Sequence, residues 1–391
     1  MNRQYVRFQI VSFLLLLTII SCSSNTKQTE KIKTLKVDLE VSNLSDFLPS
    51  ISKIKIIPLE TNSNALIGSI QKIEVFNNRA YVLDVFSAQA VFIYDLTGKH
   101  LNTISSAGKG PTEYVSPWDM AIDPFNEEII ILDPGSKKIL KYDMDGNFKQ
   151  AEYVDYFPYA IGFVDKETYC IKTMVGKKPA IILTKHNGKK TKEVHFGTRE
   201  FNMNLFSHFP RSNGKQLYVE YMNDTIYEIG KDYIKPWMII DFQDLAISPD
   251  KQEELKSIYN KNRSMPSVPH NLAGAVTPFF ETESFYKFHC NFNGGMTSVL
   301  INKKTQEQKF VNKISRGSDL FTRLLLSVYA VGGSNTFIGK FNSNDLLDLL
   351  ENCDYRLLKK QGKIEFEELG FPNQSEITLE SNPILFTINY I

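Results

Sequence analysis

The chain has 391 residues, of which 42% are hydrophobic and 23% are charged, and its formal net charge at pH 7 is +1. A charge this close to zero gives no general electrostatic attraction to nucleic acid, so we expect no nucleic-acid partner. Beyond Cys22, three widely spaced cysteines remain and no C-x-x-C pair occurs. The cysteines therefore indicate neither a disulfide framework nor a zinc site, and we predict no metal.

The first residues have the pattern of an export signal. Arg3 and Arg7 precede an apolar run from Ile10 to Ile20, which is shorter than the ~20 residues of a membrane-spanning helix and is typical of a signal-peptide core. Aliphatic and small residues leading directly to Cys22 resemble a bacterial lipoprotein signal, in which that cysteine is lipidated and becomes the new N-terminus. The alternative is an ordinary cleaved signal with an incidental cysteine.

We therefore divide the chain into a signal peptide at 1–21, a polar tether and lead-in at 22–48, and a folded body at 49–391. Residues 23–33 (SSNTKQTEKIK) contain no aromatic residue and cannot bury a core. Removal of 1–21 leaves 43 basic and 44 acidic residues, a formal charge of −1. We expect the body to contact a membrane only through the lipid.

In the body, residues 52–59 alternate polar and apolar side chains and predict a strand. The next part of the chain is nearly repeated at an offset of 48 or 49 residues. Leu-Asp at 83–84 matches Leu-Asp at 132–133, and FIYDLTG at 92–98 matches LKYDMDG at 140–146. A repeat of ~40–50 residues built only of strands is typical of a β-propeller blade. The expected strands are 70–76, 80–84, 90–95 and 101–105 in the first copy, and 118–123, 129–133, 139–143 and 148–153 in the second.

Between these copies lie GKGPTEY at 108–114 and PWDMAID at 117–123. Together with the aliphatic-x-Tyr-Asp-x-x-Gly endings, they resemble NHL-type propeller repeats and, more closely, the six-bladed propeller lipoproteins of Bacteroidetes. NDTIY at 223–227 and SNPILF at 381–386 are similar to parts of the same proteins. The resemblance implies an all-β, six-bladed propeller in the cell envelope, anchored by its lipid in the outer membrane. It implies no activity.

The later blades are less regular, and short helices are expected between them. The predicted strands are 160–171, 180–184 and 192–196 in the third blade, 215–221, 225–229 and 237–242 in the fourth, and 285–291, 297–302 and 309–311 in the fifth. The sixth blade is expected to combine 336–341 and 385–390 with the early strand at 54–59, which closes the ring. Helices are predicted at 249–262, where Ser248 precedes Pro249, and at 319–330 and 345–352.

Motifs of catalysis are absent from the sequence. It contains no H-E-x-x-H, G-x-S-x-G or P-loop, and no G-x-G-x-x-G between a strand and a helix. We accordingly predict no cofactor. The glycines at 108–110 are interpreted as a crossover between blades, with an anion-binding nest as the alternative.

Candidate ligand-binding residues follow from position in the fold. The innermost strand of each blade lines the central channel of a propeller, and the loops leading into that strand form one face. Aromatic rings there can stack on a sugar face, whereas burial between blades is the alternative reason for their presence. The channel-face candidates are Trp118, Asp119, Tyr156, Tyr159, His208 and Arg211.

We expect a non-catalytic binding or scaffold module whose partner is a glycan, a peptide or a protein. The alternative is a propeller enzyme, a lyase or hydrolase acting on a saccharide or small ester. An enzyme should bring at least two polar side chains of one set within hydrogen-bond reach in one pocket. That set is His208, His270, His289, Tyr156, Tyr159 and Arg211.

Overall fold

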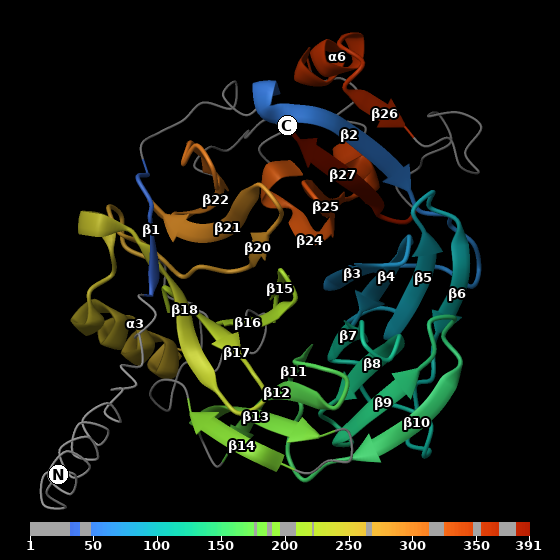
Figure 1. Ribbon diagram of the computed structural model, residues 1–391. Helices are drawn as coiled ribbons and strands as arrows, with labels where there is room; N and C mark the ends of the chain where they lie inside the picture. The colour runs from blue at the N-terminus through green and yellow to red at the C-terminus, as the bar shows by residue number, and fades with distance from the viewer. Residues whose placement is uncertain are drawn as a thin grey trace, which may run out of the picture. The chain divides into compact units, whose positions relative to one another are not determined.

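Six small β-sheets surround a common centre in the computed structural model (Figure 1). All six belong to one compact unit, Thr34–Ile391, and the following description concerns that unit. The predicted six-bladed β-propeller is confirmed. The structure describes residues 32–39, 48–175, 178–185, 190–195, 209–220, 223–262, 268–312, 324–346, 353–366 and 381–391.

Blades 1 and 2 are four-stranded antiparallel meanders, as their sequence repeat predicts. Blade 1 comprises β3 (Lys72–Phe76), β4 (Arg79–Asp84), β5 (Ala90–Asp95) and β6 (His100–Ile104). Blade 2 comprises β7 (Asp119–Asp123), β8 (Glu128–Asp133), β9 (Lys138–Tyr142) and β10 (Phe148–Tyr153). The first strand of each blade is innermost, and apolar side chains of both blades form one buried core between them.

The repeated Leu-Asp pairs have a structural role in this arrangement. Asp84 is fully buried at the end of β4, where its carboxylate accepts hydrogen bonds from the backbone N–H groups of Gly68 (2.8 Å) and Ser69 (3.0 Å). Asp133 is equally buried at the end of β8 and accepts in the same way from the N–H group of Val115 (2.6 Å). In both blades the aspartate fixes the segment that leads into the innermost strand.

Blade 3 contains β11 (Ala160–Phe163), β12 (Thr168–Val175), β13 (Lys178–Lys185) and β14 (Lys190–His195). The single strand predicted over 160–171 is therefore wrong, because a turn divides it. The N–H group of Val164 donates to the carbonyl of Thr168 (2.9 Å), and the carboxylate of Asp165 accepts from the N–H group of Glu167 (2.8 Å).

Blade 4 gains a fifth strand from the beginning of the described chain. Its order is β1 (Lys33–Lys36), β18 (Ile234–Asp241), β17 (Thr225–Ile229), β16 (Lys215–Val219) and β15 (Arg211–Ser212). In blade 5, β19 (Ala273–Gly274) and β20 (Phe279–Glu281) both pair with β21 (Phe285–Phe292), which continues into β22 (Gly295–Asn302) and β23 (Gln308–Asn312).

Blade 6 is built from both ends of the folded body, as predicted. The order is β24 (Val328–Gly333), β25 (Thr336–Phe341), β27 (Ile384–Tyr390), β2 (Ile51–Pro58) and β26 (Ile364–Phe366). β27 pairs antiparallel with β2, placing Ile54 opposite Ile388, whereas the short β26 pairs with β2 in parallel. The ring is therefore closed by hydrogen bonds between strands more than 300 residues apart.

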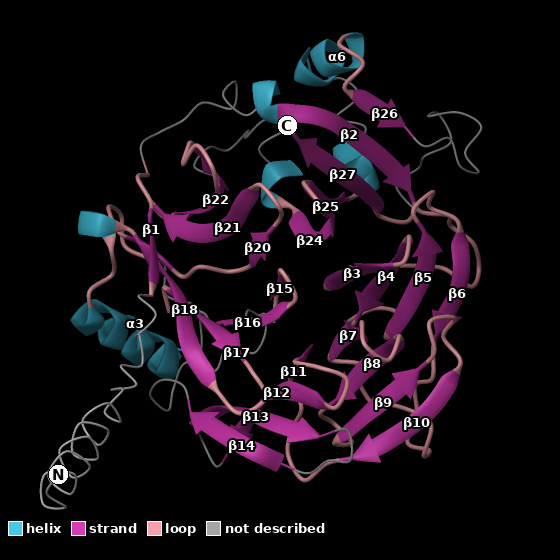
Figure 2. Ribbon diagram, in the orientation of Figure 1, coloured by secondary structure: helices cyan, strands magenta, loops and turns pink. Residues whose placement is uncertain are grey.

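Helical segments lie on connections between the strands (Figure 2). α3 (Pro249–Asn262) confirms the predicted helix, and the Ser248 side chain caps it by accepting from the N–H group of Lys251 (3.3 Å). The helix predicted to continue to Ala330 is wrong at its end, because residues 324–326 are helical but β24 begins at Val328.

Other parts of the expected helices are only partly described. Residues 343–346 are helical, while the rest of the prediction at 345–352 and residues 319–323 lie outside the described residues. The remaining segments are η1 (Leu48–Ser50), η2 (Gln243–Leu245) and α6 (Cys353–Lys360). In the described part of the chain, no helix combines the length and apolar character that crossing a bilayer requires.

Candidate functional site

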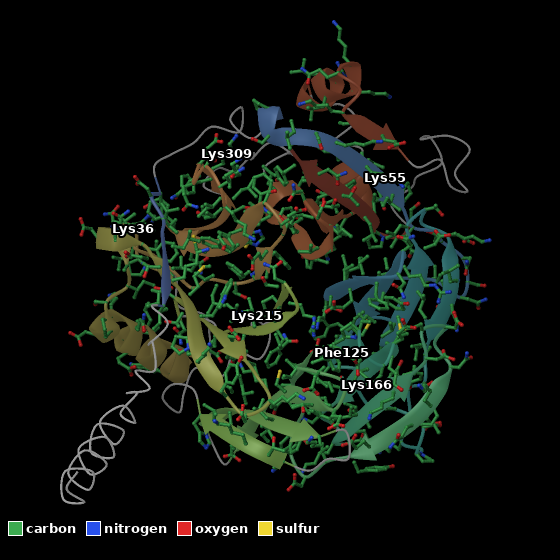
Figure 3. The ribbon with its side chains drawn as sticks, in the orientation of Figure 1. Lys36, Lys55, Phe125, Lys166, Lys215 and Lys309 are labelled. Atoms are coloured by element: carbon green, nitrogen blue, oxygen red, sulfur yellow. The ribbon has the colours of Figure 1, made fainter. Side chains whose placement is uncertain are left out.

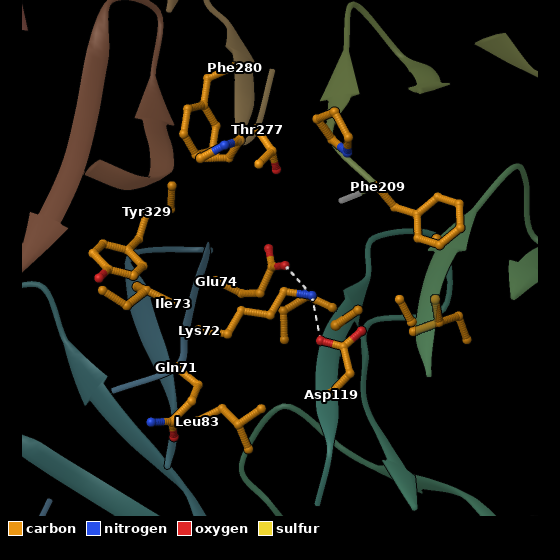
Figure 4. Close-up of a pocket in the computed structure, with 18 of the residues that line it drawn as sticks. Gln71, Lys72, Ile73, Glu74, Leu83, Asp119, Phe209, Thr277, Phe280 and Tyr329 are labelled. Carbon is orange, nitrogen blue, oxygen red and sulfur yellow. Dashed lines mark hydrogen bonds and ion pairs between the residues drawn. The ribbon is translucent and has the colours of Figure 1, made fainter. Parts of the chain in front are cut away.

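A cavity of about 590 Å³ lies at the hub of the propeller, within the ~300–1,000 Å³ typical of small-molecule sites. All six blades contribute to its lining, mainly through their innermost strands. Polar and aromatic side chains share the lining with aliphatic ones (Figure 4). The polar members include Gln71, Lys72, Glu74, Asp119, Arg211, Gln216, Thr277 and His289, and the aromatic ones are Phe86, Trp118, Tyr159, Phe163, Phe209, Phe280 and Tyr329.

Lys72 forms an ionic bridge between blades 1 and 2. Its Nζ lies 2.9 Å from Oδ1 of Asp119 on β7 and 3.4 Å from Oε1 of Glu74 on its own strand. Figure 4 shows the ammonium group between the two carboxylates. Lys72 and Glu74 share a face of β3 because they are two residues apart in a strand. The bridge therefore presents one lysine and two acids from the innermost strands of neighbouring blades.

Burial and charge act in opposite directions on these groups. Burial lowers the pKa of Lys72, but Asp119 and Glu74 outweigh that effect, so the pKa lies above its ordinary value. Burial raises the pKa of Glu74, and the positive charge of Lys72 offsets this only in part. Lys72 is consequently charged throughout the neutral range, and Glu74 takes up a proton more readily than an exposed glutamate.

Three aromatic rings form a continuous row that begins at Trp118, the residue before Asp119, and we call this row the aromatic rim. Trp118 meets Tyr159 edge to face with ring centroids 6.4 Å apart, and Tyr159 stacks on Phe157 at 6.4 Å. Trp118 and Tyr159 are half-buried and line the cavity, whereas Phe157 is 43% exposed. The Nζ of Lys137 lies 4.7 Å from the centre of the Phe157 ring. The rim thus extends from the cavity to the surface.

Two buried side-chain atoms of lining residues have no hydrogen-bond partner within the described residues. They are Oδ2 of Asp119, a residue with 9% exposure, and Nε2 of His289, a residue with 3% exposure. Burial, together with the nearby positive charge of Lys287, lowers the pKa of His289 to about 3. His289 is therefore uncharged at neutral pH.

Four of the six predicted candidates line the cavity: Trp118, Asp119, Tyr159 and Arg211. Tyr156 does not, because it packs into the core between blades 2 and 3 with 5% of its surface exposed. His208 lies outside the described residues. The sequence interpretation missed Lys72 and Glu74. Two charged residues at positions i and i+2 of an expected innermost strand share one face, and this pattern could have identified them as candidates for the cavity lining.

Three side chains of the set that would indicate an enzyme line the same cavity, namely His289, Tyr159 and Arg211. His208, another member of the set, lies outside the described residues. Among the described residues, no hydrogen bond joins any two of the three. Arg211 instead donates to the carbonyl groups of Phe163 (2.6 Å) and Gly214 (3.3 Å). Its guanidinium carbon lies 4.9 Å from the centre of the ring of Phe125, a residue labelled in Figure 3.

The glycine-rich crossover at 108–110 surrounds a side chain of its own loop. The Glu113 carboxylate accepts a hydrogen bond from the N–H group of Gly110 (2.6 Å), and a Cβ at Gly108 would overlap that carboxylate. Lys138 donates to the carbonyl groups of Gly110 (2.7 Å) and Glu113 (2.9 Å). The loop is therefore already filled by an internal anion.

The fold and its central cavity define a six-bladed β-propeller with a pocket at the hub. The chain belongs to the family described as Domain of unknown function (DUF4934), whose family model matches residues 29–389. No curated protein matches the sequence. The family description states no activity.

Solved structures share the fold at low sequence identity. A protein of Bacteroides fragilis named as a candidate exported protein is 15% identical, with a TM-score of 0.69 over 92% of this chain and 99% of its own. A member of the DUF4221 family from Bacteroides vulgatus is 9% identical, with a TM-score of 0.51 over 87% and 97%. Virginiamycin B lyase from Staphylococcus aureus reaches a TM-score of only 0.42 over 73% and 81%, which supports no argument about this chain.

Proposed function

We propose that this protein is an exported lipoprotein, anchored at Cys22 in the outer membrane, that binds a glycan, peptide or protein partner at its hub without catalysing a reaction. The observation that carries the binding role is the position of the aromatic rim, which joins the cavity to the surface. Signal-like residues before Cys22 support export and anchoring. The name of the similar Bacteroides fragilis protein agrees with export.

The chemistry of the rim favours binding. Trp118 and Tyr159 are half-buried aromatic residues of the cavity lining, where an apolar ligand surface can gain contact area. Asp119, which pairs with Lys72, directly follows Trp118 in the chain, and all three residues line the cavity, so a ligand on the rim can also meet charged groups. An ion-paired lysine with a raised pKa is a poor proton donor or nucleophile at neutral pH, because its proton is held by two acids.

The binding role is tested by removing the aromatic rim. The full chain is screened on a glycan array and a peptide library, and affinities are then measured by calorimetry. Trp118→Ala combined with Tyr159→Ala should weaken binding at least about tenfold, because hot-spot aromatics contribute ~2 kcal/mol or more. Phe148→Ala is the control, since it removes a ring that is 38% exposed on the outermost strand of blade 2. Equal affinities of the rim and control variants would refute the proposed site.

The proposed lipid anchor at Cys22 is tested separately, on the full chain. Membrane fractionation and mass spectrometry of the N-terminal peptide should find a lipid on Cys22, and Cys22→Ala should release the protein from the membrane fraction. An unlipidated N-terminal peptide in the wild type would contradict the anchoring proposal.

A further inference from the structure

The hub cavity has charged groups on one side and none on another. On blade 1, the side chains of Lys72 and Glu74 line the cavity and are 24% and 33% exposed. Within the described residues, blades 5 and 6 add no side chain that is charged at neutral pH, because His289 is neutral. The lining residues of blades 5 and 6 that keep exposed surface are Thr277, Pro278, Met296, Tyr329 and Val331.

The buried lysine of blade 5 does not add a contact to this uncharged side. Lys287 has no exposed surface and is not part of the lining. Its Nζ donates to Oγ of Ser298 (2.5 Å) and to the carbonyl group of Leu325 (3.0 Å). A ligand in the cavity therefore meets the side chains in front of Lys287 and not its ammonium group.

Apolar side chains continue from the cavity to its mouth. Phe86 and Met296 both line the cavity, and they are 64% and 39% exposed. They lie at or beside the turns that join the second and third strands of their blades, β4–β5 and β21–β22. Because the strands of a meander alternate in direction, these turns lie on the face where the innermost strands begin, which is also the face of Trp118 and Tyr159.

This apolar surface is a poor match for a saccharide. A sugar ring carries hydroxyl groups around its rim, and each needs a hydrogen-bond partner when it leaves water. The side chains of Pro278, Met296 and Val331 offer no strong partner. A polypeptide, in contrast, has side chains that are entirely apolar, and aromatic residues and methionine are enriched in protein–protein interfaces. The lining of blades 5 and 6 therefore favours a polypeptide over a glycan.

The charged side of the cavity is complementary to a peptide group. The Lys72 ammonium has three N–H donors, of which Asp119 accepts one at 2.9 Å, and its pair with Glu74 involves only Oε1 at 3.4 Å. Figure 4 shows the Glu74 carboxylate directed toward the open centre of the cavity. A peptide group brings one carbonyl acceptor for the ammonium and one N–H donor for the carboxylate.

We propose that the hub cavity binds an extended segment of a protein partner, which places a bulky apolar side chain against Met296 and Tyr329 and an adjacent peptide group on Lys72 and Glu74. The segment must be extended because Phe157, at the outer end of the aromatic rim, is 43% exposed and lies beyond the cavity lining. This inference rests on the proposed binding role of the cavity and narrows its partner to a polypeptide.

The test uses the full chain and the peptide that binds most tightly in the library screened for the proposed function, synthesised with blocked ends. Each apolar residue of this peptide is replaced in turn by serine, and each peptide N–H group is methylated in turn. Calorimetry measures the affinities. Replacement of one apolar anchor residue should weaken binding at least about tenfold, the loss expected for a residue at the centre of an interface.

Two variants of the protein test the two sides of the cavity. Met296→Asp places a carboxylate where the apolar side chain is expected to bind, and it should weaken binding at least about tenfold because the peptide would remove that charge from water. Glu74→Ala removes the acceptor for the peptide N–H group and should weaken binding about tenfold. The N-methylation that weakens binding to the wild type should have little effect on binding to Glu74→Ala.

Leu101→Asp is the matched control. Leu101 is 42% exposed on β6, the outermost strand of blade 1, and it does not line the cavity. This variant also exchanges an exposed apolar residue for a charged one, and it should keep the wild-type affinity within about twofold. Circular dichroism and thermal unfolding establish that each variant is folded.

The outcomes separate this inference from the function on which it rests. Binding of a peptide with an apolar anchor that either folded cavity variant weakens supports the inference. Peptide binding that both folded variants retain overturns it, as does a peptide whose affinity depends on no apolar residue. Glycan binding without peptide binding overturns the inference alone. Absence of any binding overturns the proposed function as well.

Discussion

At the scale of single residues, Lys287 on β21 stands out because it is a lysine with no exposed surface. Its Nζ donates to Oγ of Ser298 (2.5 Å) and to the carbonyl group of Leu325 (3.0 Å), and among the described residues it forms no ion pair. Burial lowers the pKa of Lys287 to about 7. The folded protein therefore holds this proton less tightly than the unfolded chain, whose lysines titrate near 10.4.

This difference predicts how stability depends on pH. Between pH 7 and about 10.4 the unfolded chain binds more protons at this position, so the Lys287 contribution to stability rises with pH by at most ~1.4 kcal/mol per pH unit. Lys287→Met removes the buried charge and should stabilise the protein most near pH 6.5, with an advantage that shrinks by pH 9.5. Denaturant unfolding of both proteins at several pH values measures the difference.

A surface lysine provides the comparison. Lys215 is paired with Glu228 and its side chain is 48% exposed, so Lys215→Met should change stability by a small amount that varies little from pH 7 to pH 9.5. A constant difference between Lys287→Met and the wild type over this range would show that the buried lysine does not titrate as expected.

At the scale of elements, the repeated aspartates hold the connection into each innermost strand. The Asp84 carboxylate accepts hydrogen bonds from the backbone N–H groups of Gly68 (2.8 Å), Ser69 (3.0 Å) and Ser87 (2.8 Å). All three donors lie in or beside loops of blade 1. Asp84→Ala leaves these donors without a partner and should lower the free energy of unfolding by about 3 kcal/mol. Chemical denaturation measures the loss.

The matched variant for this test is Asp145→Ala. Asp145 forms an ion pair with Arg79, and its side chain is 69% exposed, so its removal should change stability by about 1 kcal/mol or less. Similar losses for Asp84→Ala and Asp145→Ala would contradict the role assigned to the buried carboxylate.

Elements with a local signal were predictable, and those defined by distant partners were not. The strands of blades 1 and 2 were predictable because Asp and Gly recur at fixed offsets in the two repeats. Tight turns and buried caps at the strand ends favour those residue types. β1 and β26 are short and add to the edges of sheets formed by distant segments. The apolar run near 324–330 fits both a helix and a strand, and pairing with β25 determines that β24 is a strand.

The same limit applies to the candidate site. Trp118, Asp119 and Tyr159 were predictable because they follow the segments that lead into innermost strands. The pairing of Lys72 with Asp119 joins different blades over 47 residues, and no local pattern encodes it. The residues around Tyr156 and Tyr159 do not indicate which of the two rings is buried. In the fold, Tyr156 packs between blades, whereas Tyr159 lines the hub cavity.

At the scale of the whole molecule, Asn382 joins the end of the chain to the loop before blade 1. Its amide donates to the carbonyl groups of Glu60 (2.8 Å) and Ala65 (2.6 Å), and its side-chain oxygen accepts from the N–H group of Ile67 (2.8 Å). It is 3% exposed. One side chain thus satisfies backbone groups more than 300 residues away, next to the β2–β27 pairing that closes the ring.

Asn382→Ala should therefore weaken the closure of the ring more than the blades themselves. We expect a loss of about 3 kcal/mol in the free energy of unfolding, because buried backbone groups lose their partners. Hydrogen exchange should become faster in β2 and β27 than in β8, which lies inside blade 2. Asn147→Ala is the control, since among the described residues Asn147 bonds only within its own exposed turn at Asp143. Equal acceleration of exchange in β8 and β27 would mean that the propeller opens as one cooperative unit and that its closing blade is not its weakest part.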